Sequence, residues 1–366
     1  MHKSAVPLML FLLLLAGAGC ASPKPNPAPA AFAHPDEIRI GDGFRVLADR
    51  RVFVTMAFIN ATGFDDQPPA VAMHPVRQKV RQRVAENLAA HPEKLQKWRQ
   101  YARSRKLGPF AYQDFALSLE PNYPFQRVRT DKELNYPITA KRLADFPALL
   151  RDFWVTADLT NVWNEVKGDY LAELKKYDLA AMQRQMDGLW QYLRLPRQDT
   201  LTIVNVPDLL DSHYSAIAAP YEPYYYCVEG PGSHSYGLNV HEYLHSIVNP
   251  LVKTNFPAHR AKLLRYYEAG KRGPRSESYQ DAVTFTYECL VRALDRRFCA
   301  TSHLNAANAA RISAHQDWLV TDDTANGLTL TRPFYDLLPG FETSSMSFEA
   351  FLPVMLERLP EIAPRS

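Results

Sequence analysis

Residues 237–251 constrain the fold more than any other part of the sequence, because they contain two histidines and a single charged side chain in an otherwise uncharged stretch. His241 and His245 are four residues apart, so on a helix they lie one turn apart on the same side. The apolar residues of the stretch are spaced as the buried stripe of a helix: Val240, Leu244, Ile247 and Leu251. A buried helix that carries two histidines needs partners for them, since an unsatisfied polar group is costly in an apolar environment.

Glu242 completes an HExxH pattern with these histidines. Two imidazoles one turn apart can bind one metal ion, and Glu242 lies about 100° from His241 around the helix axis, where a base can act on water beside the ion. Zinc is the expected cofactor, because two imidazoles, a carboxylate and a water form a standard zinc set. Nickel, cobalt or iron would satisfy the same ligand types. The alternative, a surface helix with two solvated histidines, fits the apolar flanks poorly.

A third ligand is needed, and the HExxHxxGxxH pattern does not supply it. Asn249, Pro250 and Leu251 occupy the region where its glycine and third histidine would fall. Proline cannot continue the hydrogen-bond ladder of a helix, so we expect the helix to end at Pro250.

Residues 276–297 predict a second helix, and Glu288 lies in its apolar part. A carboxylate in such surroundings needs a cation. A metal ion would supply one, and Arg292, one turn later, would supply another through an intrahelical ion pair. We favour Glu288 as the third metal ligand, with Asp281 and Glu277 as reserve candidates.

These motifs resemble those of a known class. HExxH followed some forty residues later by a helical glutamate resembles the gluzincin clan of zinc peptidases. The phrases HEYLHSIVNPL (241–251) and YECLVRAL (287–294), with segments 73–77 and 205–210, resemble a domain-of-unknown-function family of bacterial envelope proteins whose substrates are not established. The resemblance implies a zincin-like catalytic half with ligands at His241, His245 and Glu288, and Glu242 as the base.

One departure from the gluzincin pattern concerns the support of the ligands. Those enzymes often place an aspartate four residues after the ligating glutamate, where it orients a zinc histidine; Arg292 stands there in this chain. We therefore expect the support to come from elsewhere, such as Asp281, Asp295 or a backbone carbonyl.

The first 36 residues indicate export. Residues 8–15 are an unbroken apolar run after a basic start, too short to span a bilayer as a mature helix, and small residues precede Cys20. We favour a lipoprotein-type signal over residues 1–20 with the lipid at Cys20, although Gly17 replaces the usual leucine. The Pro/Ala-rich residues 21–36 would be the tether. The alternative is cleavage after Ala18, which would give a soluble periplasmic or secreted protein.

The rest of the chain predicts an α+β fold. Residues 37–60 indicate strands, with a β-branched and aromatic run at 51–59, and helical periodicity follows over about 75–105, 140–157 and 160–194. Strands are predicted at 201–206 and 224–228, and the Gly-Pro-Gly sequence at 230–232 breaks the chain before the histidine helix. We expect a mostly helical N-terminal region (37–198) and a metal-binding region with a small mixed sheet and two metal-bearing helices (199–366).

Several further residues carry weaker signals. Tyr335, His303 or His315 could donate a hydrogen bond to an oxyanion. His234, in the loop before the motif, could contact substrate or act as a fourth ligand. Each of these residues is more typical of packing or of a loop surface. The tyrosines near 221–226 could bind a substrate backbone along a strand, or simply line a half-exposed one. Cys289 and Cys299 would lie about 15 Å apart on one helix and could not form a disulfide.

The sequence thus predicts a zinc-dependent metallohydrolase, specifically a peptidase that cleaves peptide or amide bonds in the cell envelope. Net charge is +3, from 42 basic and 39 acidic residues, a balance that does not indicate nucleic acid as a partner. The alternative is a non-catalytic metal-binding envelope lipoprotein or a scaffold.

Overall fold

The computed structural model describes residues 37–40, 43–68, 70–134, 137–196, 202–221, 223–233, 236–277, 279, 281–301 and 308–362. These residues belong to one compact unit, His34–Ser366. The predicted signal segment (1–20) and tether (21–36) lie outside the described residues, as do His234 and His303.

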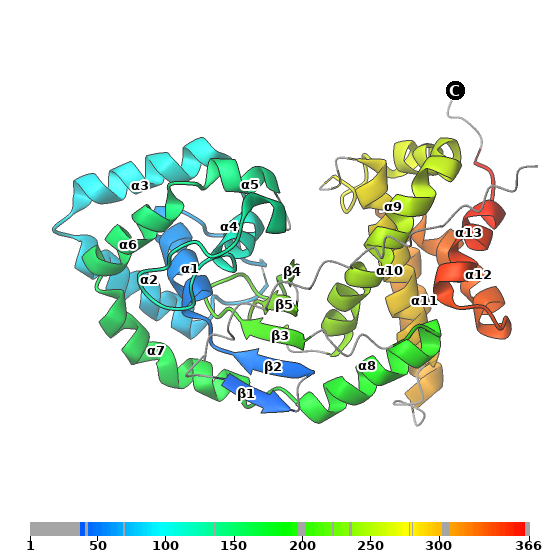
Figure 1. Ribbon diagram of the computed structural model, residues 1–366, viewed down its shortest axis with the longest axis horizontal. Coiled ribbons are helices and arrows are strands. Elements are labelled where there is room, and N and C mark those ends of the chain that lie inside the picture. Colours follow the sequence, from blue (N-terminus) through cyan, green and yellow to red (C-terminus); the bar gives the residue numbers. More distant parts are fainter. Residues whose placement is uncertain are drawn as a thin grey trace, which may run out of the picture. The chain divides into compact units, whose positions relative to one another are not determined.

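Five strands of the described chain form one mixed sheet in the order β1-β2-β3-β5-β4 (Figure 1). Their bounds are β1 (Glu37–Ile40), β2 (Phe44–Leu47), β3 (Thr202–Pro207), β4 (Ala216–Tyr221) and β5 (Tyr224–Glu229). The three central strands β2, β3 and β5 are parallel, whereas β1 and β4 are antiparallel to their neighbours. Phe44 pairs with Ile203, so the sheet joins the two predicted regions of the chain.

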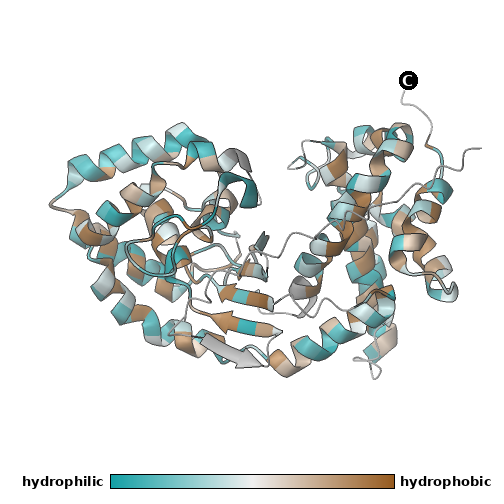
Figure 2. Ribbon diagram, viewed as in Figure 1, coloured by the Kyte–Doolittle hydropathy of each residue, from teal (hydrophilic) through white to brown (hydrophobic). Residues whose placement is uncertain are grey.

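The central strands are largely apolar, as expected for parallel strands covered on both faces (Figure 2). Every residue of β3 is buried, including Asn205, which lies opposite Cys227 of β5. The strands predicted at 201–206 and 224–228 are confirmed by β3 and β5, and the α+β fold class is confirmed with them.

The strand predicted at 51–59 is wrong, because these residues belong to helix α1 (Arg50–Thr62). The carboxylate of Asp49 caps the helix by accepting from the amide of Arg51, and Gly63, with φ of 117°, ends it. Residues 51–60 are all buried, so the helix has no polar face. Without that face the helical period disappears, and a β-branched, aromatic run looks like a strand.

Further helices fill the remainder of the N-terminal region, and the predicted helical stretches 75–105, 140–157 and 160–194 are confirmed with interruptions. Their bounds are α2 (Pro75–Leu88), α3 (Pro92–Arg105), α4 (Pro109–Ala116), the 3-10 helix η1 (Asp131–Glu133), α5 (Pro137–Arg142), α6 (Phe146–Thr156), α7 (Leu159–Leu174) and α8 (Leu179–Leu193). Proline at the start of several of them fixes φ where no amide donor is needed.

The histidine helix does not end at Pro250, contrary to prediction, because α9 runs from Tyr236 to Gly270 with Pro250 and Pro257 inside it. Each proline removes one hydrogen bond from the ladder. Apolar side chains beyond Pro250, such as Val252 and Leu263, are fully buried against the neighbouring helices. Their burial outweighs the lost bonds, which a sequence rule based on proline alone does not anticipate.

In the described part of the chain, four helices follow: α10 (Ala282–Thr301), α11 (Ala309–Ala325), α12 (Thr331–Thr343) and α13 (Phe348–Arg358). Helix α10 packs against α9, α11 and α12, and α9 and α10 run side by side in Figure 1. The predicted start of α10 at residue 276 is wrong, because Asp281 caps it by accepting from the amide of Thr284 at 2.8 Å. Within the described residues, no helix combines the length and apolar character needed to span a membrane.

Candidate metal centre

Two adjacent helices bring His241, His245 and Glu288 together. The histidines lie one turn apart in α9, with ring centroids 5.1 Å apart, and Glu288 faces them from α10. The Nε2 atom of His241 is 3.8 Å from Oε1 of Glu288, and Nε2 of His245 is 3.5 Å from Oε2. Among the described residues, these three form the one group of histidine, cysteine or carboxylate side chains that could hold a metal ion. The predicted ligands therefore converge.

The spacing of these atoms fits a small divalent cation. Zinc–nitrogen and zinc–oxygen bonds of about 2.1 Å place the ligand atoms of a tetrahedral site roughly 3.4 Å apart. The nitrogen–oxygen distances of 3.5 and 3.8 Å are close to that value. Side-chain exposures of 13%, 16% and 8% for His241, His245 and Glu288 leave the centre mostly enclosed but reachable by solvent. A catalytic metal keeps one coordination position open to water or substrate.

Further side chains orient the two imidazoles. Nδ1 of His245 lies 3.1 Å from the amide oxygen of Asn249, so we assign the proton to Nδ1, which leaves the lone pair of Nε2 free. Nδ1 of His241 faces Oδ2 of the buried Asp295 at 3.9 Å. Asp295 thus occupies the supporting position that the sequence left open, whereas Asp281 caps α10 instead.

The electrostatics place a neutral imidazole beside an ionised carboxylate. Burial lowers the pKa of His241 to about 3, although the charge of Glu288 opposes the effect. Burial alone would raise the pKa of Glu288, but His241, Arg292 and His245 outweigh it and lower the pKa to about 2. Neutral histidine and ionised glutamate are the protonation states that bind a metal.

Glu288 also makes the ion pair with Arg292 that the sequence offered as the alternative to metal binding. Nε of Arg292 donates to Oε1 of Glu288 at 2.7 Å. The same carboxylate therefore contacts Arg292 through Oε1 while Oε2 is turned towards His245. Oε1 also lies 3.8 Å from Nε2 of His241, so the ion pair and a metal ion would share this carboxylate in one geometry.

Glu242 lies beside this group and not within it. Its backbone carbonyl accepts a hydrogen bond from the hydroxyl of Tyr225, which fixes the helix against β5. Burial raises the pKa of the Glu242 carboxyl to about 7, and the charges of Glu288 and Glu229 add to this effect. No hydrogen bond or ion pair engages that carboxylate within the described part of the chain, so it is free to exchange a proton with a substrate or water.

The other candidate residues do not reach the centre. Glu277 is exposed before α10, and Tyr335 is buried in α12 with Arg297 and Arg332 against its ring. His315 stacks on Trp318 in α11. Cys289 and Cys299 are both free thiols on α10, as the helix geometry predicted.

The tyrosines near 221–226, which the sequence offered as a strand for a substrate backbone, lie on two strands, because Tyr221 ends β4 and Tyr224 begins β5. Strand β5 is paired on both sides, with β3 and with β4, so it cannot accept a further strand. The edge of the described sheet next to α9 is instead β4, which contacts that helix. Its sequence AIAAPY has few β-branched or aromatic residues, so the strand left little signal.

Two groups around the centre were missed from the sequence. Asn249 was noted only because it interrupts another pattern, yet its position four residues after His245 is a usable signal. Asp323 of α11 contacts Arg292 and has no local signature, because the contact depends on how α10 and α11 pack. Comparison of the chain with protein-family models, with curated proteins and with solved structures finds no match.

Proposed function

We propose that this protein is a zinc-dependent hydrolase of peptide or amide bonds, with His241, His245 and Glu288 as metal ligands and Glu242 as the general base. The observation that carries the proposal is the convergence of two Nε2 atoms and one carboxylate from two packed helices. A bound zinc ion would supply Lewis acidity for the substrate carbonyl and for water. The ligand set also agrees with the gluzincin resemblance of the sequence.

The chain's own groups supply the remaining chemistry. Asn249 orients the ring of His245 through Nδ1, and the carboxylate of Asp295 faces Nδ1 of His241 at 3.9 Å. The carboxylate of Glu242 follows His241 directly in the helix, and within the described residues no hydrogen bond or ion pair engages it. It can take a proton from the attacking water and deliver it to the leaving amine.

A peptide as the substrate class is supported by the resemblance of the HExxH motif and the helical glutamate to the gluzincin clan of zinc peptidases. Together with the leader-like residues 1–20, this supports a peptidase of the cell envelope, anchored through Cys20.

A second function, a scaffold that binds no metal, is favoured by one specific contact. Arg292 already neutralises Glu288 at 2.7 Å, so the buried carboxylate does not require a metal ion as its counter-charge. In this case the histidines would serve packing, and Glu242 would have no role in catalysis.

Zinc content and peptide hydrolysis separate the two functions. The chain without residues 1–20 is purified as the parent and as His241→Ala, Glu288→Ala and Glu242→Gln variants, with His315→Ala as a control away from the centre. Zinc per chain is measured by elemental analysis, and hydrolysis with a mixture of quenched fluorescent peptides. We expect about one zinc ion in the parent and control, and a loss of zinc in His241→Ala and Glu288→Ala.

The Glu242→Gln variant is expected to keep its zinc and lose hydrolysis by a factor of at least about 100. A parent that takes up no zinc, even when zinc is resupplied, would leave the scaffold as the function. Full hydrolysis by Glu242→Gln would remove Glu242 from the role of base.

A further inference from the structure

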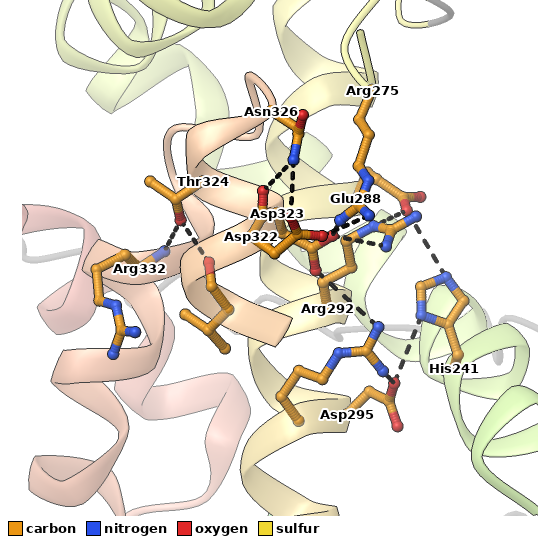
Figure 3. Close-up of polar contacts among 12 residues, drawn as sticks. His241, Arg275, Glu288, Arg292, Asp295, Asp322, Asp323, Thr324, Asn326 and Arg332 are labelled. Carbon is orange, nitrogen blue, oxygen red and sulfur yellow. Dashed lines mark hydrogen bonds and ion pairs between the residues drawn. The ribbon is translucent and has the colours of Figure 1, made fainter. Parts of the chain in front are cut away.

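Asp323, a buried carboxylate outside the metal centre, lies within 4.0 Å of three arginine side chains. The side chain of Asp323, on α11, is only 1% exposed. Its Oδ1 atom accepts one hydrogen bond from Arg275 and another, at 3.2 Å, from Nη1 of Arg292. Arg296 approaches its Oδ2 at 4.0 Å. Figure 3 shows Arg292 between Asp323 and Glu288. The guanidinium of Arg292 is thus shared by two carboxylates on different helices.

We infer that Asp323 is a positioning residue for the metal ligand Glu288 and acts through Arg292. This inference rests on the proposed function, because it assigns a role in metal binding. Asp323 itself contacts none of the three ligands within the described residues.

The first argument concerns the oxygens of Glu288. Arg292 holds Oε1 at 2.7 Å, while Oε2 lies 3.5 Å from Nε2 of His245. Oε1 also lies 3.8 Å from Nε2 of His241, so the hydrogen bond from Arg292 helps to set how both oxygens face the histidines. A guanidinium can bind both oxygens of one carboxylate in a fork, and in that arrangement Arg292 would compete with a metal ion for both of them.

The second argument concerns the position of Arg292. Its Nε donates to Glu288 while its Nη1 donates to Asp323, so the guanidinium bridges the two carboxylates and Asp323 holds one end of it. Asp323 and Glu288 both raise the pKa of Arg292 above its ordinary value, against the effect of burial. Its positive charge is divided between the two, which weakens its competition with a metal ion at Glu288.

The third argument concerns the rigidity of Asp323. Arg275 pairs with both Asp323 and the neighbouring Asp322, the latter at 2.6 Å. Arg296 also pairs with Asp295 at 2.8 Å, and Asp295 faces His241. The network therefore connects two of the three ligands to α11, and a group held by several partners can orient another one.

The test is a double-mutant cycle on zinc affinity. Asp323→Asn, Arg292→Leu and the double variant are titrated with zinc against a chromophoric chelator, and cobalt(II) is used as a spectroscopic probe of the ligand geometry. Asp322→Asn is the matched control, since it removes a carboxylate that pairs with Arg275 but not with Arg292. Circular dichroism of the metal-free proteins monitors folding.

We expect Asp323→Asn to weaken zinc binding by about 10- to 100-fold and to change the visible cobalt spectrum, whereas Asp322→Asn stays within about threefold of the parent. In the Arg292→Leu background, adding Asp323→Asn should change the affinity by less than about threefold. If Asp323→Asn does not fold, Arg292→Lys replaces it. Lysine lacks the fork that bridges two carboxylates and should weaken binding by about tenfold.

Unchanged zinc affinity in whichever of these two variants folds overturns the inference. An equal loss from Asp323→Asn with and without Arg292 does the same, because the effect would not pass through that arginine. A parent that binds no zinc overturns the proposed function itself, so the two failures are distinguishable.

Discussion

The amide oxygen of Asn249 lies 3.1 Å from Nδ1 of His245, one turn further along the same helix. We expect Asn249→Leu to weaken zinc binding by about tenfold, because the imidazole loses the acceptor that fixes its proton on Nδ1. Asn249→Asp keeps an acceptor and should stay within about threefold of the parent. Competition titration with a chelator measures both.

The control for this prediction is Asn255→Leu, which removes another asparagine of α9 whose amide donates to the carbonyl of Leu251 and does not contact a ligand histidine. Equal affinity in Asn249→Leu and the parent would show that the ring of His245 is held by its other neighbours.

A second prediction concerns zinc-linked stability. A ligand that binds only the folded state stabilises it by about 4.1 kcal/mol when its concentration is 1,000 times Kd. Zinc at that excess should therefore raise the free energy of unfolding of the parent by about this amount, and a chelator should reverse the effect. Urea unfolding at fixed protein concentration measures it.

His245→Ala should be insensitive to zinc, whereas His259→Ala, on the same helix, should respond as the parent does. His259 faces Glu357 of α13 and lies outside the metal group. A zinc response that survives in His245→Ala would place the binding site elsewhere.

Tyr177 provides a stability prediction that does not depend on a metal. Its hydroxyl donates to Oε2 of the fully buried Glu229 at 2.7 Å. Tyr177→Phe should lower the free energy of unfolding by about 1.5–3 kcal/mol, the usual range for a hydrogen bond to a charged group. Urea denaturation measures the change.

Tyr112→Phe is the matched control, because the buried hydroxyl of Tyr112 makes no hydrogen bond within the described part of the chain. Its removal should change the free energy of unfolding by less than about 0.5 kcal/mol. A loss of similar size in both variants would attribute the effect to packing.

The pair Asp208 and Asp211 predicts how stability varies with pH. Both carboxylates accept from Nε2 of Gln113 at 2.9 Å in the interior. Burial raises the pKa of Asp208 well above its ordinary value, and the charge of Asp211 raises it further. Burial also raises the pKa of Asp211, although Ser215 and Gln113 oppose it. The folded state therefore binds protons more tightly than the unfolded state does.

A carboxyl group whose pKa is raised in the folded state contributes its full stability when the pH is below its unfolded pKa of about 3.9. This contribution to the free energy of unfolding is lost as the pH rises through the folded pKa. Asp211→Asn removes one of the two charges, so its free energy of unfolding should improve relative to the parent between pH 4 and 8. The gain is about 1.4 kcal/mol for each unit by which the pKa is raised. Urea unfolding across this range tests it, with Asp66→Asn, an exposed carboxyl, as the control. A difference that is constant with pH would contradict the prediction.

The candidate metal ligands, as a group that converges, could be predicted from the sequence because their signals are local. His241 and His245 share one helix, and Glu288 stands out as a carboxylate in an apolar run. Asp323 could not be predicted, since it meets Arg292 only through the packing of α11 on α10.

The errors in the fold have the same origin. The sequence of α1 predicts a strand, because residues 51–60 are buried on every side of the helix. An exposed polar face, which would give the sequence its helical periodicity, is therefore missing. The sequence predicts that α9 ends at Pro250, because proline interrupts the hydrogen bonds of a helix. The helix continues to Gly270, and the burial of Val252 and Leu263 stabilises the part beyond the proline. In each case tertiary contacts decide against the local preference.

The parallel pairing of β2 with β3 has a consequence for how the molecule is assembled in time. Phe44 must find Ile203, about 160 residues later in the chain, and a contact of such sequence separation forms slowly. The helices α9 and α10 follow β3 and β5 in the sequence. During synthesis, the residues of the candidate metal centre are therefore added only after all three central strands have been made. Cutting the chain before β3 would leave that strand without its neighbour β2, and the residues that follow cannot be expected to fold as an independent fragment.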